Sequence, residues 1–511
     1  MTGRVRSVCR VSAAAASSWA TGAWHHRWFL GASAIATLGF TWLVTLGTFR
    51  FAEREVFGNF YDYQAASLLE GRLDVPEEAI GGEAFEAHGK LYGYFGPTPA
   101  LLRLPFVLTG LAFGQLSRAF MVAYFAGCLC AAYLLLIEGL RLTAGAATPA
   151  DDAVATPSPL ATCLLAFNVG WGSTIFFLGS RGFIFHEAIL AGIVFALWSS
   201  WCSLRFLARP ASRWWLGALA CGLLSLHARP PTGLFALTLL GSVAVALAVR
   251  QLRHRASSGG GSIAAPGALR RYVPIGAACA ACALTLQGLA YLKFGVFDPA
   301  PLSISRPYRN PERLAAIDGQ SLHAVNLPFN FYTYLVRPNY RIEAGFPWIY
   351  LGSTVPGHYF PKAKIDLADH TLAITYAMPG LFTLATVGCL GAALLAPALR
   401  SAIGLVWLAS LPMTLVLFAA VATAQRYTGD FCPLLITAAS LALAALPRCP
   451  PPWQSVWPPI ALVTGAAGVA VTVALTLHYQ GETLWGVPEP TRANYRQLRH
   501  TIDRCFDLAP R

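Results

Sequence analysis

Residues 118–140 read RAFMVAYFAGCLCAAYLLLIEGL, an apolar stretch whose two charged residues, Arg118 and Glu138, lie near its ends. A helix needs about 20 such residues to cross the hydrocarbon core of a bilayer. Similar stretches recur along the chain, in which 56% of residues are hydrophobic and only 12% are charged. Soluble domains carry about twice that charged fraction. The sequence therefore predicts an all-α polytopic membrane protein.

The apolar stretches predict about eleven transmembrane helices, with an error of about two. They cover residues 28–49, 118–140, 159–178, 187–207, 214–228, 231–249, 272–293, 371–397, 402–422, 430–447 and 457–477. The segment 214–228 is short and contains His227. Residues 99–116 are apolar but interrupted by Arg103, Pro105 and Gly110, so they are also compatible with a helix along the membrane surface.

Basic residues predict the orientation, because cytoplasmic loops are enriched in arginine and lysine. The tail 1–27 and the loop 250–271 each contain several arginines and no acid, so we expect both on the cytoplasmic side. The two longest loops, 50–98 and 294–370, then share the outer side. The C-terminal tail 478–511, expected to be helical from Thr491, lies there too.

The net charge of +13 follows from this topology, so we expect membrane lipids as partners and no nucleic acid. The chain contains only four lysines, Lys90, Lys293, Lys362 and Lys364. Their scarcity beside many arginines indicates a GC-rich, bacterial genome. We therefore predict a multi-pass protein of the bacterial cytoplasmic membrane with a single membrane domain over 28–477.

The first outer loop contains a candidate base. Asn59 is positioned to cap a helix over about 60–70, which Gly71 would end in a left-handed conformation. Asp62 lies in the first turn, where the helix dipole favours the ionised carboxylate. Such a carboxylate at the membrane boundary could act as a general base. The alternative is that Asp62 only stabilises the helix start.

Two phrases of this region carry a resemblance, as does Asp62 with its aromatic neighbours. The phrases are ASLLEGRLDVP (66–76) and YFGPTPALLRLP (94–105). Together with the order of tail, span and outer loop, they resemble bacterial glycosyltransferase-C-type membrane proteins. That superfamily includes protein O-mannosyltransferases, lipid A aminoarabinose transferases and mycobacterial arabinofuranosyltransferases. Three further phrases resemble an uncharacterised subgroup of it: FHEA (185–188), ARPPTG (228–233) and RYTGDF (426–431).

The resemblance implies transfer of a sugar from a polyprenyl-phosphate donor to an acceptor hydroxyl on the outer face. The acceptor would be a cell-envelope glycan, a glycolipid or a protein. Asp62 matches the acid that takes the acceptor's proton in this family. Many relatives have a paired acid where this chain has Gln64, so a divalent cation remains open and no cofactor is certain. Asp74 and Tyr94, later in the loop, are further candidate substrate contacts.

The residues themselves indicate where a donor phosphate would bind. No nucleotide sugar is available outside the cytoplasm, so a lipid phosphate must carry the activated sugar and needs a cation near the outer surface. Arg426 lies in a predicted outer turn, and a guanidinium matches phosphate oxygens in a bidentate way. The alternative is an arginine that snorkels from a helix end. Arg229 is either a second phosphate contact or a turn residue.

His186 and Glu187 open a predicted span on the same side, where they line the site or hold Arg181. The sequence also leaves two other classes of function open. One is a transporter or lipid flippase, and the other is a non-catalytic partner in polysaccharide assembly. Convergence of Asp62, His186, Glu187 and Arg426 on one outward-facing cavity would favour the enzyme, whereas dispersion would favour purely structural roles for these residues.

Overall fold

The computed structural model describes residues 26–144, 156–257, 265–354, 359–483 and 489–506. It is 73% helical and has almost no sheet. Among the described residues, nine helices are long and apolar enough to cross a membrane. This confirms the predicted all-α, multi-pass membrane fold. The arginines of the N-terminal tail before residue 26 lie outside the described residues.

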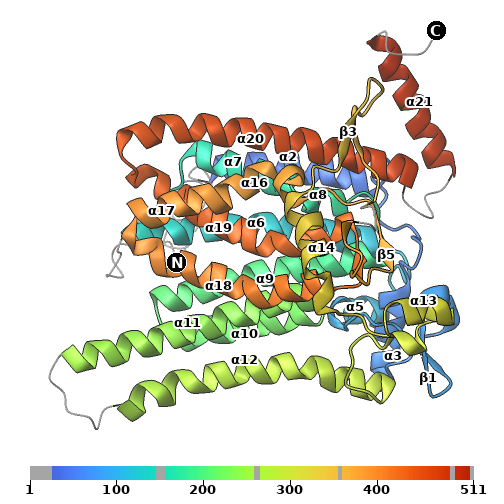
Figure 1. The fold of residues 1–511 in the computed structure, drawn as a ribbon, viewed down its shortest axis with the longest axis horizontal. Helices are drawn as coiled ribbons and strands as arrows, with labels where there is room; N and C mark the ends of the chain where they lie inside the picture. The colour runs from blue at the N-terminus through green and yellow to red at the C-terminus, as the bar shows by residue number, and fades with distance from the viewer. Residues whose placement is uncertain (1–25, 145–155, 258–264, 355–358, 484–488, 507–511) are drawn as a thin grey trace, which may run out of the picture.

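The long helices lie side by side in one bundle (Figure 1). Their sequences are apolar on nearly all sides, as expected for helices surrounded by lipid and by one another. They are α2 (Arg27–Val44), α6 (Ser117–Ala144), α7 (Pro159–Gly170) with α8 (Thr174–Leu178), α9 (Ile184–Ala208), α11 (Pro230–Ser257), α12 (Ala265–Phe294), α18 (Arg400–Ala419), α19 (Cys432–Ala445) and α20 (Pro451–His478).

Two of the predicted spans are not among the nine long helices. Residues 214–228, predicted as a short span, form α10 (Ser212–Leu226), a 15-residue helix that packs against α9 and α11. Residues 371–397 form α15 (Ile374–Ala377), α16 (Pro379–Thr383), the π-helical turn η9 (Leu384–Gly388) and α17 (Cys389–Leu395). A continuous helix is interrupted before α16 because Pro379 has no amide hydrogen and its ring clashes with the preceding turn.

The predicted cytoplasmic loop 250–271 is also shorter than expected. Helix α11 continues to Ser257 and α12 already begins at Ala265. Arginine has a high helix propensity, so the basic residues extend the helices beyond their apolar parts.

The short elements gather at one end of the bundle, which we call the loop end (Figure 1). The first loop forms α3 (Phe60–Leu69), α4 (Glu77–Ile80), β1 (Phe85–Ala87) and β2 (Lys90–Tyr92), followed by α5 (Thr98–Thr109). The second forms α13 (Pro311–Ala316), α14 (Leu327–Phe331), β3 (Tyr340–Ile342), β4 (Ile349–Leu351) and β5 (Leu367–Ala368). Strands β1–β2 and β3–β4 are antiparallel, whereas β5 pairs in parallel with β6 (Ala422–Thr423). The two large loops therefore share one side, as the charge pattern predicts.

Local sequence patterns correctly predicted the helices α3 and α21. Helix α3 is followed by Gly71, whose φ of 70° is the predicted left-handed conformation. Asn59 is the N-cap residue, but its side chain makes no capping bond and instead donates to the Glu78 carbonyl oxygen at 3.5 Å. Helix α21 (Glu489–Cys505) confirms the helical C-terminal tail and lies at the loop end (Figure 1). Helix α5 has 12 residues and is too short to cross a bilayer.

Candidate functional site

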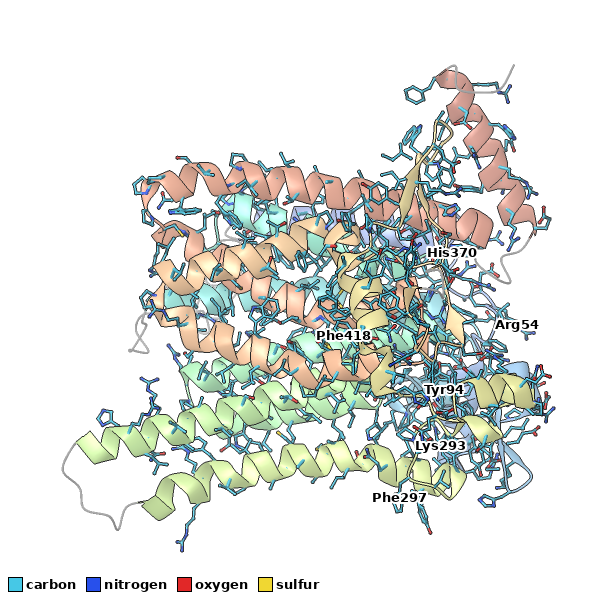
Figure 2. All side chains as sticks on the ribbon, in the orientation of Figure 1. Arg54, Tyr94, Lys293, Phe297, His370 and Phe418 are labelled. Carbon is cyan, nitrogen blue, oxygen red and sulfur yellow. The ribbon has the colours of Figure 1, made fainter. Side chains whose placement is uncertain are left out.

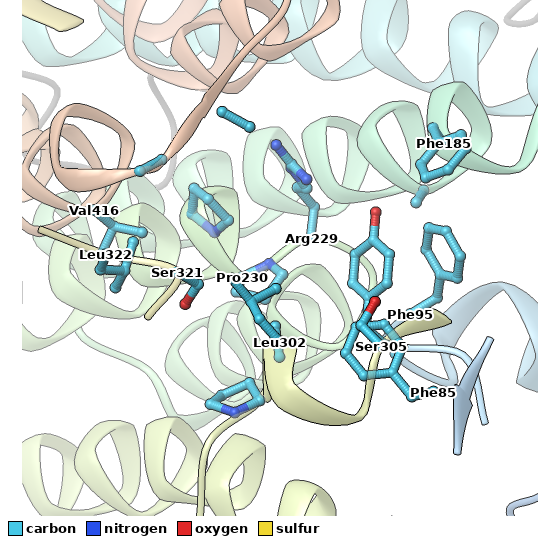
Figure 3. A pocket seen from close by; sticks show the side chains of 18 of the residues that line it. Phe85, Phe95, Phe185, Arg229, Pro230, Leu302, Ser305, Ser321, Leu322 and Val416 are labelled. Carbon is cyan, nitrogen blue, oxygen red and sulfur yellow. The ribbon is translucent and has the colours of Figure 1, made fainter. Parts of the chain in front are cut away.

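A cavity of about 650 Å³ lies at the loop end, between the two large loops and the helix ends beneath them. Most of its lining is apolar or aromatic. In the view of Figure 3, Phe85 and Phe95 of the first loop lie on one side of the cavity, and Leu322 and Val416 lie on the other. Arg229 lies between these two sides. The cavity thus joins segments that are far apart in the sequence.

The charged side chains on this wall are predominantly cationic. Among the described residues the lining contains four cations, Arg229, Lys293, Arg313 and Arg426, and one carboxylate, Glu83. The resulting positive field favours an anionic ligand, because low-dielectric walls strengthen the effect of unneutralised charge.

Two of the four cations are already neutralised by carboxylates. Arg229 makes three hydrogen bonds to Asp430, at 2.6, 2.9 and 3.1 Å. Arg313 donates to both oxygens of Asp366, at 2.8 and 2.7 Å. Such bidentate pairs fix the geometry of both partners. We infer that these two arginines shape the wall and have little charge left for a ligand.

Arg426 retains more of its charge. It lies on the short helix η11 (Gln425–Phe431), and its nearest carboxylate in a described ion pair, Asp369, is 3.8 Å away. Its guanidinium packs over the rings of Phe185 and Tyr427, at 5.3 and 5.0 Å from the centroids. Its Nε has no hydrogen-bond partner within the described part of the chain. The aromatic rings therefore orient a guanidinium that can still bind an anion.

Lys293 holds the aromatic segment of the first loop against α12. Its Nζ is buried and donates to the carbonyl oxygens of Gly93 and Phe95, at 2.9 Å each. Tyr94, between these two carbonyls, stacks on Phe95 with ring centroids 4.2 Å apart. Burial raises the pKa of Tyr94, so its hydroxyl stays neutral. Figure 2 shows Tyr94 and Lys293 together at the loop end.

Asp62, the predicted base, lies outside this cavity lining. Its carboxylate is fully buried, and Arg103 donates to it at 2.6 Å. Burial raises the pKa of Asp62, and Arg103 opposes that rise, whereas the sequence had predicted surroundings that favour the ionised form. The same Arg103 donates to both oxygens of Glu187, at 2.7 and 2.8 Å. The two acids and Arg103 thus form a buried triad instead of part of the cavity wall.

His186 and Asp74 are also absent from the cavity lining. The His186 Nδ1 lies 3.0 Å from the Leu178 carbonyl oxygen, and its ring packs edge-on against Phe183. Asp74 accepts hydrogen bonds from Arg72 and Lys90, at 2.7 and 3.1 Å. Of the residues predicted for the site, Arg229, Arg426 and Tyr94 come together on the cavity, whereas Asp62, Glu187, His186 and Asp74 do not. The convergence of Asp62, His186, Glu187 and Arg426 on one cavity is therefore not observed, which favours structural roles for Asp62, His186 and Glu187.

Three residues that matter at the loop end were not among those predicted for the site. Arg103 and Lys293 are single charges in apolar segments, and such charges require a partner or a cavity. That rule could have drawn attention to both, although not to their partners. Glu83 has no such signal, because it is one of several acids in a polar loop.

The lining side chains alone do not fit a divalent cation. Among the described residues, no group of three or more His, Cys, Asp and Glu side chains could hold a metal ion. Glu83 is the one carboxylate of the described cavity lining. A magnesium-like ion requires several oxygen ligands in near-octahedral geometry, which a single carboxylate does not supply.

The arrangement suits an amphiphilic anion. An apolar, concave wall binds hydrocarbon or ring surface, and a few placed polar groups orient the ligand. Arg426 supplies the group that would recognise a phosphate. No family model, curated protein or solved structure matches the chain.

Proposed function

We propose that this protein is an integral-membrane glycosyltransferase. It moves a sugar from a polyprenyl-phosphate donor to an acceptor hydroxyl at the loop end, on the outer face of the membrane. The observation that carries the proposal is the cavity at the ends of the membrane helices, where an apolar wall meets the guanidinium of Arg426. A lipid phosphate has a hydrocarbon chain for the apolar wall and a phosphate for the guanidinium, whereas a soluble anion would gain little from the apolar wall.

An apolar groove supports a lipid donor. A second cavity of about 530 Å³ is lined mostly by apolar residues of α11, α12 and α18, with the hydroxyls of Thr238 and Ser242 among them. The same three helices also contribute to the first cavity. The two linings are separated by less than one helical turn on α11, between Pro231 and Leu234, and on α12, between Leu286 and Ala283. An isoprenoid chain lying in this groove would leave its phosphate in the cavity beside Arg426.

The transporter alternative receives less support. A transport path requires polar or ionisable groups at the middle depth of the membrane. The buried ion pairs described here lie towards the ends of their spans, as Glu187 does on α9 and Asp430 does before α19. Most of these paired groups lie at the loop end, where a surface reaction would occur, and the Glu138–Arg205 pair lies at the opposite ends of α6 and α9.

A substitution at Gly241 of α11 tests the groove. Gly241 lines the groove and has open space where a Cβ would be. Gly241→Phe should weaken binding of a long-chain polyprenyl phosphate by about 10-fold, because displacing about two methylenes costs roughly 0.8 kcal/mol each. Gly276→Phe is the matched control, since Gly276 also faces open space but does not line the groove. Equal weakening by both variants, or equal weakening for geranyl phosphate, would contradict this placement of the chain.

Proteoliposomes test the activity itself. The donors are synthetic long-chain polyprenyl-phosphate hexoses and pentoses labelled in the sugar, and the acceptors are envelope glycans, glycolipids and proteins of a bacterial extract. We expect the protein to release polyprenyl phosphate from at least one donor and to place the label in a new product. Passage of an intact lipid-linked sugar between leaflets without cleavage would instead establish the flippase alternative.

A further inference from the structure

Glu83 differs from the other acids of the first loop. Residues 50–98 contain nine acids. Eight of them have a described partner: Glu53 with Arg50, Glu55 with Arg118, Asp62 with Arg103, Glu70 and Asp74 with Arg72, Glu77 and Glu86 with Arg306, and Glu78 with Tyr63. Within the described residues, Glu83 has neither a hydrogen bond nor an ion pair, and it alone of the nine lines the cavity.

The backbone around Glu83 is held in place by the second large loop. The Arg306 side chain donates to the Gly81 carbonyl oxygen at 3.0 Å and pairs with Glu77 and Glu86. The Arg306 amide donates to the carbonyl oxygen of Ala84 at 2.9 Å. Glu83 is therefore anchored on both sides while its own carboxylate stays free. A free carboxylate on a fixed backbone is a typical arrangement for a proton-transfer group.

The surroundings of Glu83 combine burial with positive charge. Burial raises the pKa of its carboxyl, and the positive charges of Arg426 and Arg313 oppose that rise. The other titratable groups on this wall are Arg229, Lys293 and the tyrosines Tyr94, Tyr308 and Tyr427. The pKa of Glu83 is raised overall, towards the range in which a carboxylate is a more effective proton acceptor.

We propose that Glu83, and not Asp62, accepts the proton of the acceptor hydroxyl, an inference that rests on the proposed glycosyl transfer. The acceptor oxygen forms its bond to the anomeric carbon as the bond between that carbon and the phosphate oxygen breaks. The electron pair of the broken bond leaves with the polyprenyl phosphate beside Arg426. The acceptor's proton ends on the Glu83 carboxylate, so atoms and charge balance.

The test separates binding from turnover in Glu83→Gln. Turnover of the labelled donor should fall by about 100-fold or more, since a general base contributes at least that factor. Binding of a synthetic long-chain polyprenyl phosphate should stay equal or become tighter, because the substitution removes a negative charge near the phosphate. Glu83→Asp should recover part of the turnover. Glu78→Gln is the control, since Glu78 belongs to the same loop but not to the cavity lining.

The pH profile gives a second readout. Because the base must be ionised, turnover should fall as the pH drops through the raised pKa of Glu83, and Glu83→Gln should lose this acid limb. Wild-type turnover with an equally active Glu83→Gln would overturn the role of Glu83 and leave the glycosyl transfer standing. Consumption of no donor by the wild type would overturn both. A folded Asp62→Asn variant without turnover, beside an active Glu83→Gln, would assign the proton transfer to Asp62.

Discussion

Arg103→Met is expected to destabilise the folded protein by about 3–5 kcal/mol, the usual cost of removing one partner from a buried ion pair. Arg103 is the cation between the carboxylates of Asp62 and Glu187, and all three side chains have an exposed fraction of 0%. Methionine fills much of the same volume without charge. The two acids would then have to protonate or draw water into the packing between α3, α5 and α9.

Thermal unfolding of the purified protein in detergent measures this effect. The matched control is Arg72→Met, because Arg72 also lies between two acids, Glu70 and Asp74, but on the exposed part of the first loop. That substitution should leave the unfolding temperature nearly unchanged, since exposed ion pairs contribute little.

A rescue experiment tests the cause. Asp62→Asn combined with Glu187→Gln in the Arg103→Met background should recover part of the lost stability, because the uncompensated charges are then removed. If Arg103→Met unfolds at the same temperature as Arg72→Met, the triad does not stabilise the fold. If the two amide substitutions destabilise the Arg103→Met variant further, the loss has another cause than unpaired charge.

Arg426→Gln is expected to weaken binding of a long-chain polyprenyl phosphate by about 10- to 100-fold. A hydrogen bond to a charged group contributes roughly 1.5–3 kcal/mol, and glutamine keeps a donor but loses the charge and the fork of the guanidinium. Arg229→Gln should weaken phosphate binding less than Arg426→Gln does, since Arg229 is already paired with Asp430. In Arg426→Gln, turnover of any donor that the wild type consumes should fall by at least the same factor as the affinity for polyprenyl phosphate.

Titration of the reconstituted variants with a fluorescent polyprenyl phosphate measures the affinity. The uncharged polyprenol of the same length is the comparison ligand and should bind wild type and Arg426→Gln alike. Arg341→Gln serves as the control variant, because Arg341 lies on β3, is exposed and does not line the cavity. Equal phosphate affinity in wild type and Arg426→Gln, or an equal loss for the polyprenol, would show that Arg426 does not bind the phosphate.

Local patterns in the sequence predicted the membrane fold and parts of the loop end. Apolar stretches of sufficient length specify membrane helices by themselves, because a helix satisfies its backbone hydrogen bonds within its own segment. The left-handed position of Gly71 and the helical C-terminal tail follow from equally local rules. The arginine of the RYTGDF phrase was predicted to lie at the site from its charge and its place in the chain, and Arg426 does line the cavity. Its role as a phosphate contact stays a prediction.

The broken segment 371–397 and the choice among the acids depended on the tertiary structure. Arg103 donates to Glu187, which is 84 positions away in the sequence, and Arg229 donates to Asp430, which is 201 positions away. No local pattern therefore indicates which carboxylate each arginine neutralises. Asp62 and Glu83 belong to the same acidic loop in the sequence. Packing of α5 and α9 gives Asp62 a buried cation, whereas the contact between the two large loops places Glu83 on the cavity wall.

The sequence by itself determined the membrane helices and the presence of charge at the loop end. Only the three-dimensional packing decided which of these charges remain free for chemistry, because an ion pair depends on distance in space and not on separation along the chain.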